Sequence, residues 1–283
     1  MRLATIRSAG GTRAVRVEAM EAVEIGPADL VEVLADPQWR HTAAGASGAR
    51  HGIDGLDYAP LVVSPEKIIC VGLNYRAHIL EMGRELPDHP TLFAKYARSL
   101  VGAHDDITLP AVSGALDWEA ELGVVIGAPV RHATVDQARA AIAGYTVVND
   151  VTARDWQSRT LQWLQGKTFE ATTPVGPWLV TAGPDDAPPR AALTCEVDGE
   201  TMQAAGTGDL VFDPVTLVAY ISQVITLMPG DLIATGTPGG VGHGRKPARY
   251  LSEGSVVVTR IDGIGELRNT CRAERLEVGA ARA

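Results

Sequence analysis

The pattern of apolar and polar positions predicts a chain that is rich in short β-strands. Runs of β-branched and other apolar residues alternate with glycine and proline, as is typical of strands joined by turns. In the larger part of the chain these runs are 67–71, 121–126, 145–148, 179–181, 193–197, 231–235 and 255–261. We therefore expect a sheet or barrel with few covering helices, which is a mixed α/β, strand-rich fold class.

Two segments carry helix signals instead. Thr134 and Gln137 have the spacing of a capping box, and the helix that they open is expected to end at Gly144. Asp213 followed by Pro214 is a cap with proline at the first helical position, and it starts a second helix. The apolar stripe of that helix is expected to pack in the core, and its members are Val218, Ile221, Val224, Ile225 and Met228.

The first 63 residues are predicted to form a small α+β domain of their own. A hairpin is expected between residues 3 and 17, and a short helix over 28–34. Pro60 and Pro65 mark the passage to the main domain, which we place at 64–283. The whole chain has 283 residues, so this second domain is long enough to bury a sizeable core.

Composition and charge narrow the range of partners. The formal net charge of −9 and the absence of a Lys/Arg run argue against nucleic acid or an anionic membrane. Cys70, Cys195 and Cys271 are far apart and in no CxxC pattern, so reduced thiols are expected rather than disulfides or a zinc site. The N-terminus lacks the apolar stretch of a signal peptide, and the longest apolar run, 217–228, is too short to span a bilayer. We expect a soluble, cytoplasmic protein.

Candidate chemistry centres on the segment LDWEAELGVVIG at 116–127, which we interpret as one buried strand. Side chains on a strand alternate faces, so Glu119 and Glu121 should point the same way, with Cα atoms about 7 Å apart. Like charges that close are costly unless a cation lies between them, although both could instead lie on a solvated strand end. Asp150, after the next strand, is either a third carboxylate or a turn aspartate. Three carboxylates would suit Mg²⁺, Mn²⁺ or Ca²⁺ rather than zinc.

Two other segments offer catalytic side chains. If the piece between Gly72 and Gly83 is helical, His78 and Glu81 share a face, and the pair is either a general base with its orienting carboxylate or a surface ion pair. Lys167 lies in a Gly-Lys-Thr sequence that lacks the upstream glycine of a P-loop, so we reject nucleotide binding. Lys167 is instead a candidate cation for a substrate carboxylate or enolate.

Two polar segments leave their roles open. Arg154 and Gln157 follow Asp150, and they lie either on a helical turn that faces the carboxylates or on the ordinary surface. The segment TGTPGGVG at 235–242 follows a predicted strand, but its glycines do not match a dinucleotide-binding fingerprint. Such a loop can present N–H groups and hydroxyls to a ligand, or it can merely turn the chain.

Taken together, these segments resemble the fumarylacetoacetate hydrolase family. The similarity runs in order from about residue 64 to 272, through VGLNYRAHILEMG, LDWEAELGVVIG, VVNDVTARDWQ, GKTFE, GPWLVT, MPGDLIATGTPGGVG and EGSVVVTRIDGIGELRN. The resemblance implies a mixed β-roll catalytic domain, usually dimeric, with one divalent ion per active site. Residues 1–63 look like the short, variable N-terminal domain of bacterial members.

The resemblance also implies roles for individual residues. The metal ligands of the family fall on Glu119, Glu121 and Asp150. The lid dyad of the family falls on His78 and Glu81, and its substrate-contacting lysine falls on Lys167. Its other substrate-binding positions fall on Arg154, Gln157 and Thr237. Thr235 is a less favoured match for the threonine. One departure from the family pattern is Lys95-Tyr96, where relatives commonly have a lysine followed by proline. The fourth acidic ligand of longer eukaryotic members has no counterpart here.

The functional hypothesis is a Mg²⁺- or Mn²⁺-dependent hydrolase that cleaves the C–C bond of a 2,4-dioxo acid such as an acylpyruvate. His78, oriented by Glu81, would activate water, and the ion and Lys167 would stabilise a pyruvate enolate. Oxaloacetate decarboxylation and isomerisation or hydration of a 2-oxo-enoic acid are alternatives at the same site. A non-catalytic metal-binding scaffold is a further alternative. The expected assembly is a homodimer.

Overall fold

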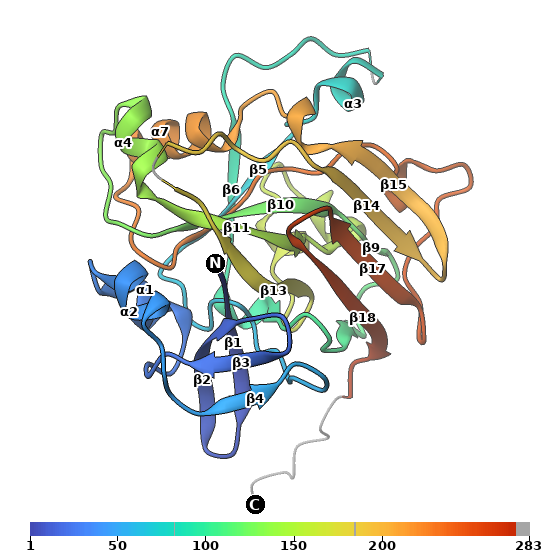
Figure 1. The fold of residues 1–283 in the computed structure, drawn as a ribbon. Coiled ribbons are helices and arrows are strands. Elements are labelled where there is room, and N and C mark those ends of the chain that lie inside the picture. The colour runs from blue at the N-terminus through green and yellow to red at the C-terminus, as the bar shows by residue number, and fades with distance from the viewer. Residues whose placement is uncertain (82, 184, 276–283) are drawn as a thin grey trace, which may run out of the picture.

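One large sheet organises the computed structural model, which describes residues 1–81, 83–183 and 185–275 (Figure 1). In order across this sheet the strands are β4 (Arg50–Gly52), β3 (Glu21–Glu24), β2 (Gly11–Val17), β1 (Arg2–Ser8), β13 (Thr173–Thr181), β11 (Ile142–Asn149), β10 (Ala120–Ile126), β16 (Leu232–Ala234), β5 (Ile68–Gly72) and β6 (Thr91–Lys95). The short strand β7 (Leu100–Val101) pairs with β13 as well. The predicted strand-rich, mixed fold class is confirmed.

A second sheet of five strands lies to the right in Figure 1, against the first. Its order is β15 (Glu200–Gly206), β14 (Ala192–Val197), β17 (Val256–Ile261), β18 (Gly265–Ala273) and β8 (Ile107–Leu109). A separate two-stranded ribbon joins β9 (Leu116–Asp117) to β12 (Thr152–Ala153). All seven strands predicted for the larger part of the chain occur, as parts of β5, β10, β11, β13, β14, β16 and β17.

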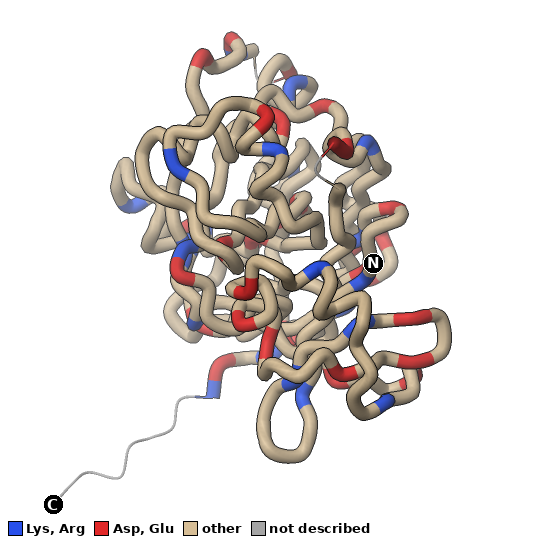
Figure 2. Tube along the Cα trace, turned by 60° about the vertical axis from the view of Figure 1, so that its left-hand side comes forward, with Lys and Arg blue, Asp and Glu red and all other residues tan. Residues whose placement is uncertain are grey.

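The helices are short. They are α1 (Leu30–Ala35), α2 (Trp39–Ala44), α3 (Arg76–Glu81), α4 (Val135–Ala141), α5 (Arg154–Gln157), α6 (Leu164–Lys167) and α7 (Pro214–Val224), with 3₁₀ turns at Ala97–Ser99, Thr207–Asp209 and Gly242–Gly244. None of the helices in the described part of the chain is long and apolar enough to cross a membrane. Figure 2 shows that Lys and Arg positions are interspersed with Asp and Glu positions along the described chain.

Both predicted helices start as expected but end earlier. The Thr134 capping box is present, yet α4 ends at Ala141, and Gly144 lies inside β11. A Cβ at Gly144 would lie 2.1 Å from the Val180 carbonyl oxygen, so this glycine permits close strand packing rather than ending a helix. In α7 only the first part of the apolar stripe is buried, because Val224 is 66% and Ile225 44% exposed.

The N-terminal residues extend the large sheet. The predicted hairpin is formed by β1 and β2, and Leu3 of β1 pairs with Leu179 of β13. Asp29 caps α1, which confirms the short helix predicted there. The division of the chain at residue 64 stays a prediction, and residues 276–283 of the predicted second domain lie outside the described residues.

The core has two parts, one on each side of the large sheet. Leu122 and Val124 of β10 pack between the two sheets, whereas Val125 packs on the other side, with Leu30 and Leu34 of α1. This alternation along β10 decides where its polar residues lie. Glu121 belongs to the same side as Val125, opposite the second sheet.

Candidate active site

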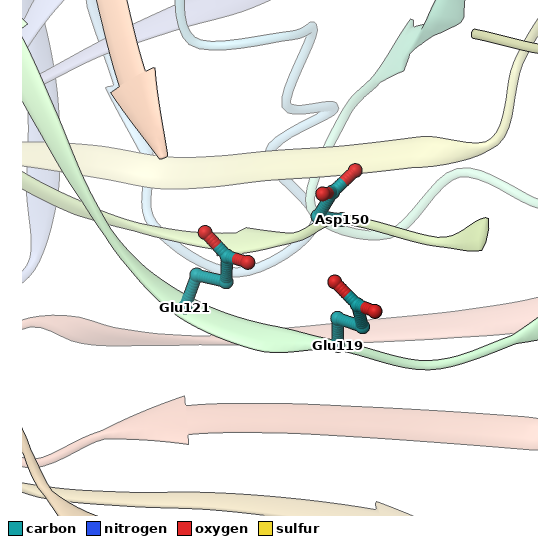
Figure 3. Close-up of side chains that lie close together, drawn as sticks. All are labelled: Glu119, Glu121 and Asp150. Atoms are coloured by element: carbon teal, nitrogen blue, oxygen red, sulfur yellow. The ribbon is translucent and has the colours of Figure 1, made fainter. Parts of the chain in front are cut away.

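Three carboxylates meet where β10 and β11 run side by side (Figure 3). Glu119 immediately precedes β10, Glu121 is its second residue, and Asp150 immediately follows β11. The antiparallel register pairs Ala120 with Asn149, and the Asp150 N–H donates to the Glu119 carbonyl oxygen at 2.8 Å. One carboxylate oxygen from each of the three residues lies within 4.8 Å of the others. The predicted approach of the three carboxylates is confirmed.

The backbone N–H groups of Glu119 and Ala120 are held by side-chain amides rather than by backbone carbonyls of a neighbouring strand. Segment 116–127 is not the single strand that was expected, because β9 turns away to pair with β12 and β10 begins only at Ala120. The Glu119 N–H donates to Asn149 Oδ1 at 2.9 Å, and the Ala120 N–H donates to Gln203 Oε1 at 2.9 Å. These two amides replace the missing ladder bonds and fix Glu119 beside the strand.

Three buried cations surround two of the carboxylates. Lys167 Nζ lies 2.7 Å from both Glu119 and Asp150, and Lys95 Nζ lies 2.7 Å from Asp150. Arg154 lies 2.6 Å from Glu119. Burial acts to lower the pKa of Lys167, but the facing carboxylates outweigh it and the net pKa is raised. For Asp150, burial acts to raise the pKa, and the two lysines outweigh it, so the net pKa is lowered.

Glu121 differs from the other two carboxylates. Its Oε2 accepts the Gly236 N–H at 2.7 Å, and no cation pairs with it among the described residues. Burial, followed by the neighbouring charges of Asp150 and Glu119, raises the pKa of Glu121 well above its usual range. Glycine is needed at 236 because its φ is +102° and a Cβ there would lie 2.9 Å from the Cβ of Asn74.

The donor set fits a divalent cation. With Asp117, four buried carboxylates face three buried cations, so when all four are ionised the group has one excess negative charge, which a bound cation would compensate. All donors are carboxylate oxygens, which hard cations prefer, and each oxygen that accepts a hydrogen bond keeps a second lone pair. We conclude that Glu119, Glu121 and Asp150 can hold one such ion.

A cavity of about 320 Å³ opens at Glu119, the member of the triad that lines it. Glu119, Arg154, Gln157, Lys167, His78 and Thr237 line it together with apolar side chains, which include Phe93 and Trp163. This volume is at the small end of the range for ligand sites. A larger cavity, about 670 Å³, lies between the N-terminal helices and the segments at the ends of β10 and α4, and the carboxylate cluster does not line it.

The proposed lid dyad lies on α3, as the sequence predicted. His78 and Glu81 share one face of the helix, and His78 Nδ1 lies 4.0 Å from Glu81 Oε2. That distance allows attraction between charges but not a hydrogen bond. The side chain of His78 is 24% exposed and that of Glu81 is 80% exposed, so the imidazole lines the cavity while the carboxylate lies outside it.

The open alternatives for the polar segments are decided by contacts. Arg154 and Gln157 lie on α5 and face the carboxylates, and Arg154 Nη1 donates to Gln157 Oε1 at 2.9 Å. Thr237 lines the cavity, and its hydroxyl donates to the Ala120 carbonyl and accepts from Gln203. Thr235 is fully buried and bonded to the Leu122 carbonyl oxygen, which leaves Thr237 as the threonine that can reach a ligand.

Two residues of the site were not assigned from the sequence. Lys95 ends the largely apolar strand TLFAK. A lysine in such a strand is the sequence signal that could have marked it as a site residue. Asp117 accepts from Arg154 Nε at 2.8 Å and from the N–H groups of Gly242 and His243, so it joins α5 to the loop after β16. The Tyr96 N–H donates to a threonine hydroxyl at 2.9 Å, which the more usual proline could not do.

The fold and the acidic site define a class of enzyme in which a divalent-cation site lies beneath a small-molecule cavity. Residues 67–272 match the family described as fumarylacetoacetate (FAA) hydrolase C-terminal. The chain therefore belongs to the fumarylacetoacetate hydrolase family, as the sequence segments suggested.

Similar proteins include both tautomerases and hydrolases. The chain is 44% identical over 209 residues to the mitochondrial oxaloacetate tautomerase Fahd2a of Rattus norvegicus, across 74% of this chain and 67% of that one. A fumarylacetoacetate hydrolase from psychrophilic Exiguobacterium antarcticum has a TM-score of 0.86 and 35% identity, over 97% of this chain and 100% of that one. Maleylpyruvate hydrolase from Sphingobium sp. SYK-6, solved with manganese(II) and pyruvate, has a TM-score of 0.79 and 29% identity over the same shares.

Proposed function

We propose that this family member is a divalent-cation-dependent enzyme that interconverts the keto and enol forms of a small 2-oxo acid such as oxaloacetate. The observation that carries the proposal is the position of His78 and Lys167, which line one small cavity together with Glu119 of the acidic triad. A proton acceptor and a fixed cation would thus face the same ligand. The identity to an oxaloacetate tautomerase supports the choice of reaction.

The residues around the cavity would divide the binding of the substrate between them. Glu119, Glu121 and Asp150 would hold Mg²⁺ or Mn²⁺, which when bound supplies Lewis-acid polarisation of a 2-oxo acid. Arg154 uses only part of its five donors on its neighbours, and with Gln157 it would bind the substrate carboxylate from the cavity wall. The apolar side chains would contact the carbon chain.

Proton transfer would rest on the lid helix and the buried lysine. His78 would take a proton from C3 of the keto acid, the electron pair of the broken C–H bond would form the C2=C3 double bond, and the π pair of the C2 carbonyl would move onto its oxygen. Lys167 would stabilise the negative charge that develops on this oxygen, and a proton from water then gives the enol. Glu81 would stabilise the imidazolium, which then returns its proton to water.

The test starts from enol oxaloacetate and follows the loss of its ultraviolet absorbance. Wild type with Mg²⁺ should accelerate the decay, and chelator should abolish the effect. His78→Asn should lower kcat by roughly 10²–10⁴. The matched control is His41→Asn, which changes an exposed histidine of α2 and should behave as wild type. Decay at the uncatalysed rate with metal-loaded wild type would contradict the proposal.

Hydrolysis of a 2,4-dioxo acid is the second candidate, and the His78–Glu81 pair favours it because such a pair can deprotonate water. The water oxygen would bond to C4, the C3–C4 bond would break, and its electron pair would leave with a pyruvate enolate that is then protonated at C3. Loss of diketone absorbance with one pyruvate formed per molecule would support this reaction. Pyruvate from oxaloacetate would instead indicate decarboxylation, and metal binding without turnover would indicate a scaffold.

The predicted homodimer and cytoplasmic location stay predictions. Light scattering on the purified protein tests the first of them, since a mass of twice 29.9 kDa is expected.

A further inference from the structure

We infer that Arg84 determines specificity at the far end of the substrate, so that this enzyme selects 2-oxo acids that carry a second carboxylate. The inference rests on the proposed function, because it assumes that a 2-oxo acid occupies the cavity. It adds a residue outside the acidic triad, the lid dyad and the polar residues discussed so far.

The end of the lid helix directs Arg84 to the cavity. Gly83 has a φ of +68°, and its N–H donates to the Leu80 carbonyl oxygen at 2.9 Å, while the Arg84 N–H donates to Ile79 at 3.2 Å. These two bonds form a Schellman motif, which turns the chain back at the end of a helix. Arg84 then lines the same cavity as His78.

Arg84 is available to a ligand, unlike the other fixed cations that line the cavity. Lys167 and Arg154 are buried and paired with carboxylates of the site. Arg84 is exposed, and within the described ranges it forms no ion pair and no side-chain hydrogen bond. Arg84 therefore lies at the open rim of the cavity, where its guanidinium can reach a ligand, and the paired cations lie in the floor.

With a divalent ion bound, one substrate carboxylate would balance the net charge of the cavity floor. A second substrate carboxylate would then need a cation at the rim. Four buried carboxylates face three buried cations, so a bound divalent ion would give the floor one net positive charge. One substrate carboxylate neutralises that charge, and a second would need a further cation. Arg84 supplies it, and the wall between is apolar, formed in part by Val71, Leu73, Phe93, Trp163 and Val241.

The experiment measures binding to the Mn²⁺-loaded protein by calorimetry, with two ligands that differ in one charge. The ligands are 2-oxoglutarate and 2-oxopentanoate, in which a methyl group replaces the distal carboxylate. Wild type should bind the dicarboxylate about tenfold more tightly. Arg84→Gln should remove most of that preference. The control is Arg76→Gln, since Arg76 is exposed on α3, the helix that precedes Arg84, but does not line the cavity, and it should keep the preference.

Salt gives a second readout. A charge at the rim is screened by solvent ions, so the preference of wild type should shrink in 0.5 M KCl, where the Debye length is only about 4–5 Å. Equal affinity of wild type for both ligands, a preference that survives Arg84→Gln, or an equal loss in Arg76→Gln would overturn the inference alone. Failure of wild type to bind either ligand would instead overturn the proposed function and the inference with it.

Discussion

Glu119→Gln and Glu121→Gln make the same chemical change two residues apart, and we expect the first to destabilise the metal-free protein much more than the second. Glu119 pairs with Arg154 at 2.6 Å and with Lys167 at 2.7 Å. Glu121 accepts one backbone N–H and pairs with no cation in the described ranges. Comparing the two variants therefore tests whether Glu119 is stabilised by ion pairs that Glu121 lacks.

The magnitude for Glu119 follows from the cost of breaking a buried ion pair. Removing one partner of such a pair costs about 3–5 kcal/mol. Arg154 keeps Asp117 and Lys167 keeps Asp150 as second partners, so a value at or just below the lower end of that range applies. We expect Glu119→Gln to reduce the free energy of unfolding by about 2–3 kcal/mol.

The magnitude for Glu121 is smaller because glutamine resembles the protonated acid. Burial raises the pKa of Glu121 in the fold, so the folded state keeps a proton that the unfolded state releases above about pH 4.3. The metal-free wild type should therefore lose stability as pH rises from 5 towards 8. Glu121→Gln should remove this part of the loss and change stability at pH 7 by less than about 1 kcal/mol.

The assay is urea unfolding in the presence of chelator, followed by tryptophan fluorescence at several pH values. A second series contains Mn²⁺, which should stabilise wild type by about 2.7 kcal/mol at one hundred times its Kd and should stabilise neither variant as much. Equal destabilisation by both substitutions at pH 7 would refute the reasoning. An unchanged pH slope in Glu121→Gln would refute it as well.

The contacts around the triad lead to three other expected outcomes. Affinity for Mn²⁺ should rise from pH 6 to pH 8, because the ion displaces the proton of Glu121, and calorimetry should show proton release; a flat profile would contradict this. Gly236→Ala should cost about 1–3 kcal/mol in urea unfolding, since its φ is +102°, and a neutral result would contradict the close packing on Asn74. Asp117→Asn should raise KM more than it lowers kcat, because it loosens Arg154, which we propose binds the substrate; steady-state kinetics with an equal fall in kcat would argue against that role.

The strands and the acidic triad were predictable because they depend on local periodicity. β10 and β11 are buried along their whole length, so they appear as apolar runs, and any residue pair two apart on them shares a face. Glu119 and Glu121 follow this rule even though Glu119 lies just outside the strand. The resemblance to a family then supplied the roles of residues that spacing left undecided.

The helix ends and the additional charged residues depend on contacts between distant segments. Gly144 has the same local signal whether it ends a helix or permits close strand packing, and only the nearby Val180 carbonyl decides. Lys95 and Asp150 are 55 positions apart in the chain. Asp117 lies beside the triad in sequence, but its role depends on Arg154 and the loop after β16. No local pattern could show these pairings.

The pairing of β1 with β13 has a consequence for how the chain can be divided. Residues 1–63 precede the segment that matches the family, yet β1 covers one edge of β13, whose other edge pairs with β11, the strand that leads to Asp150. A truncated chain that starts at residue 64 would expose the backbone N–H and C=O groups of that edge to other chains. The N-terminal strands thus protect this edge from pairing with other chains. Only β13 separates β1 from β11, the strand that positions Asp150.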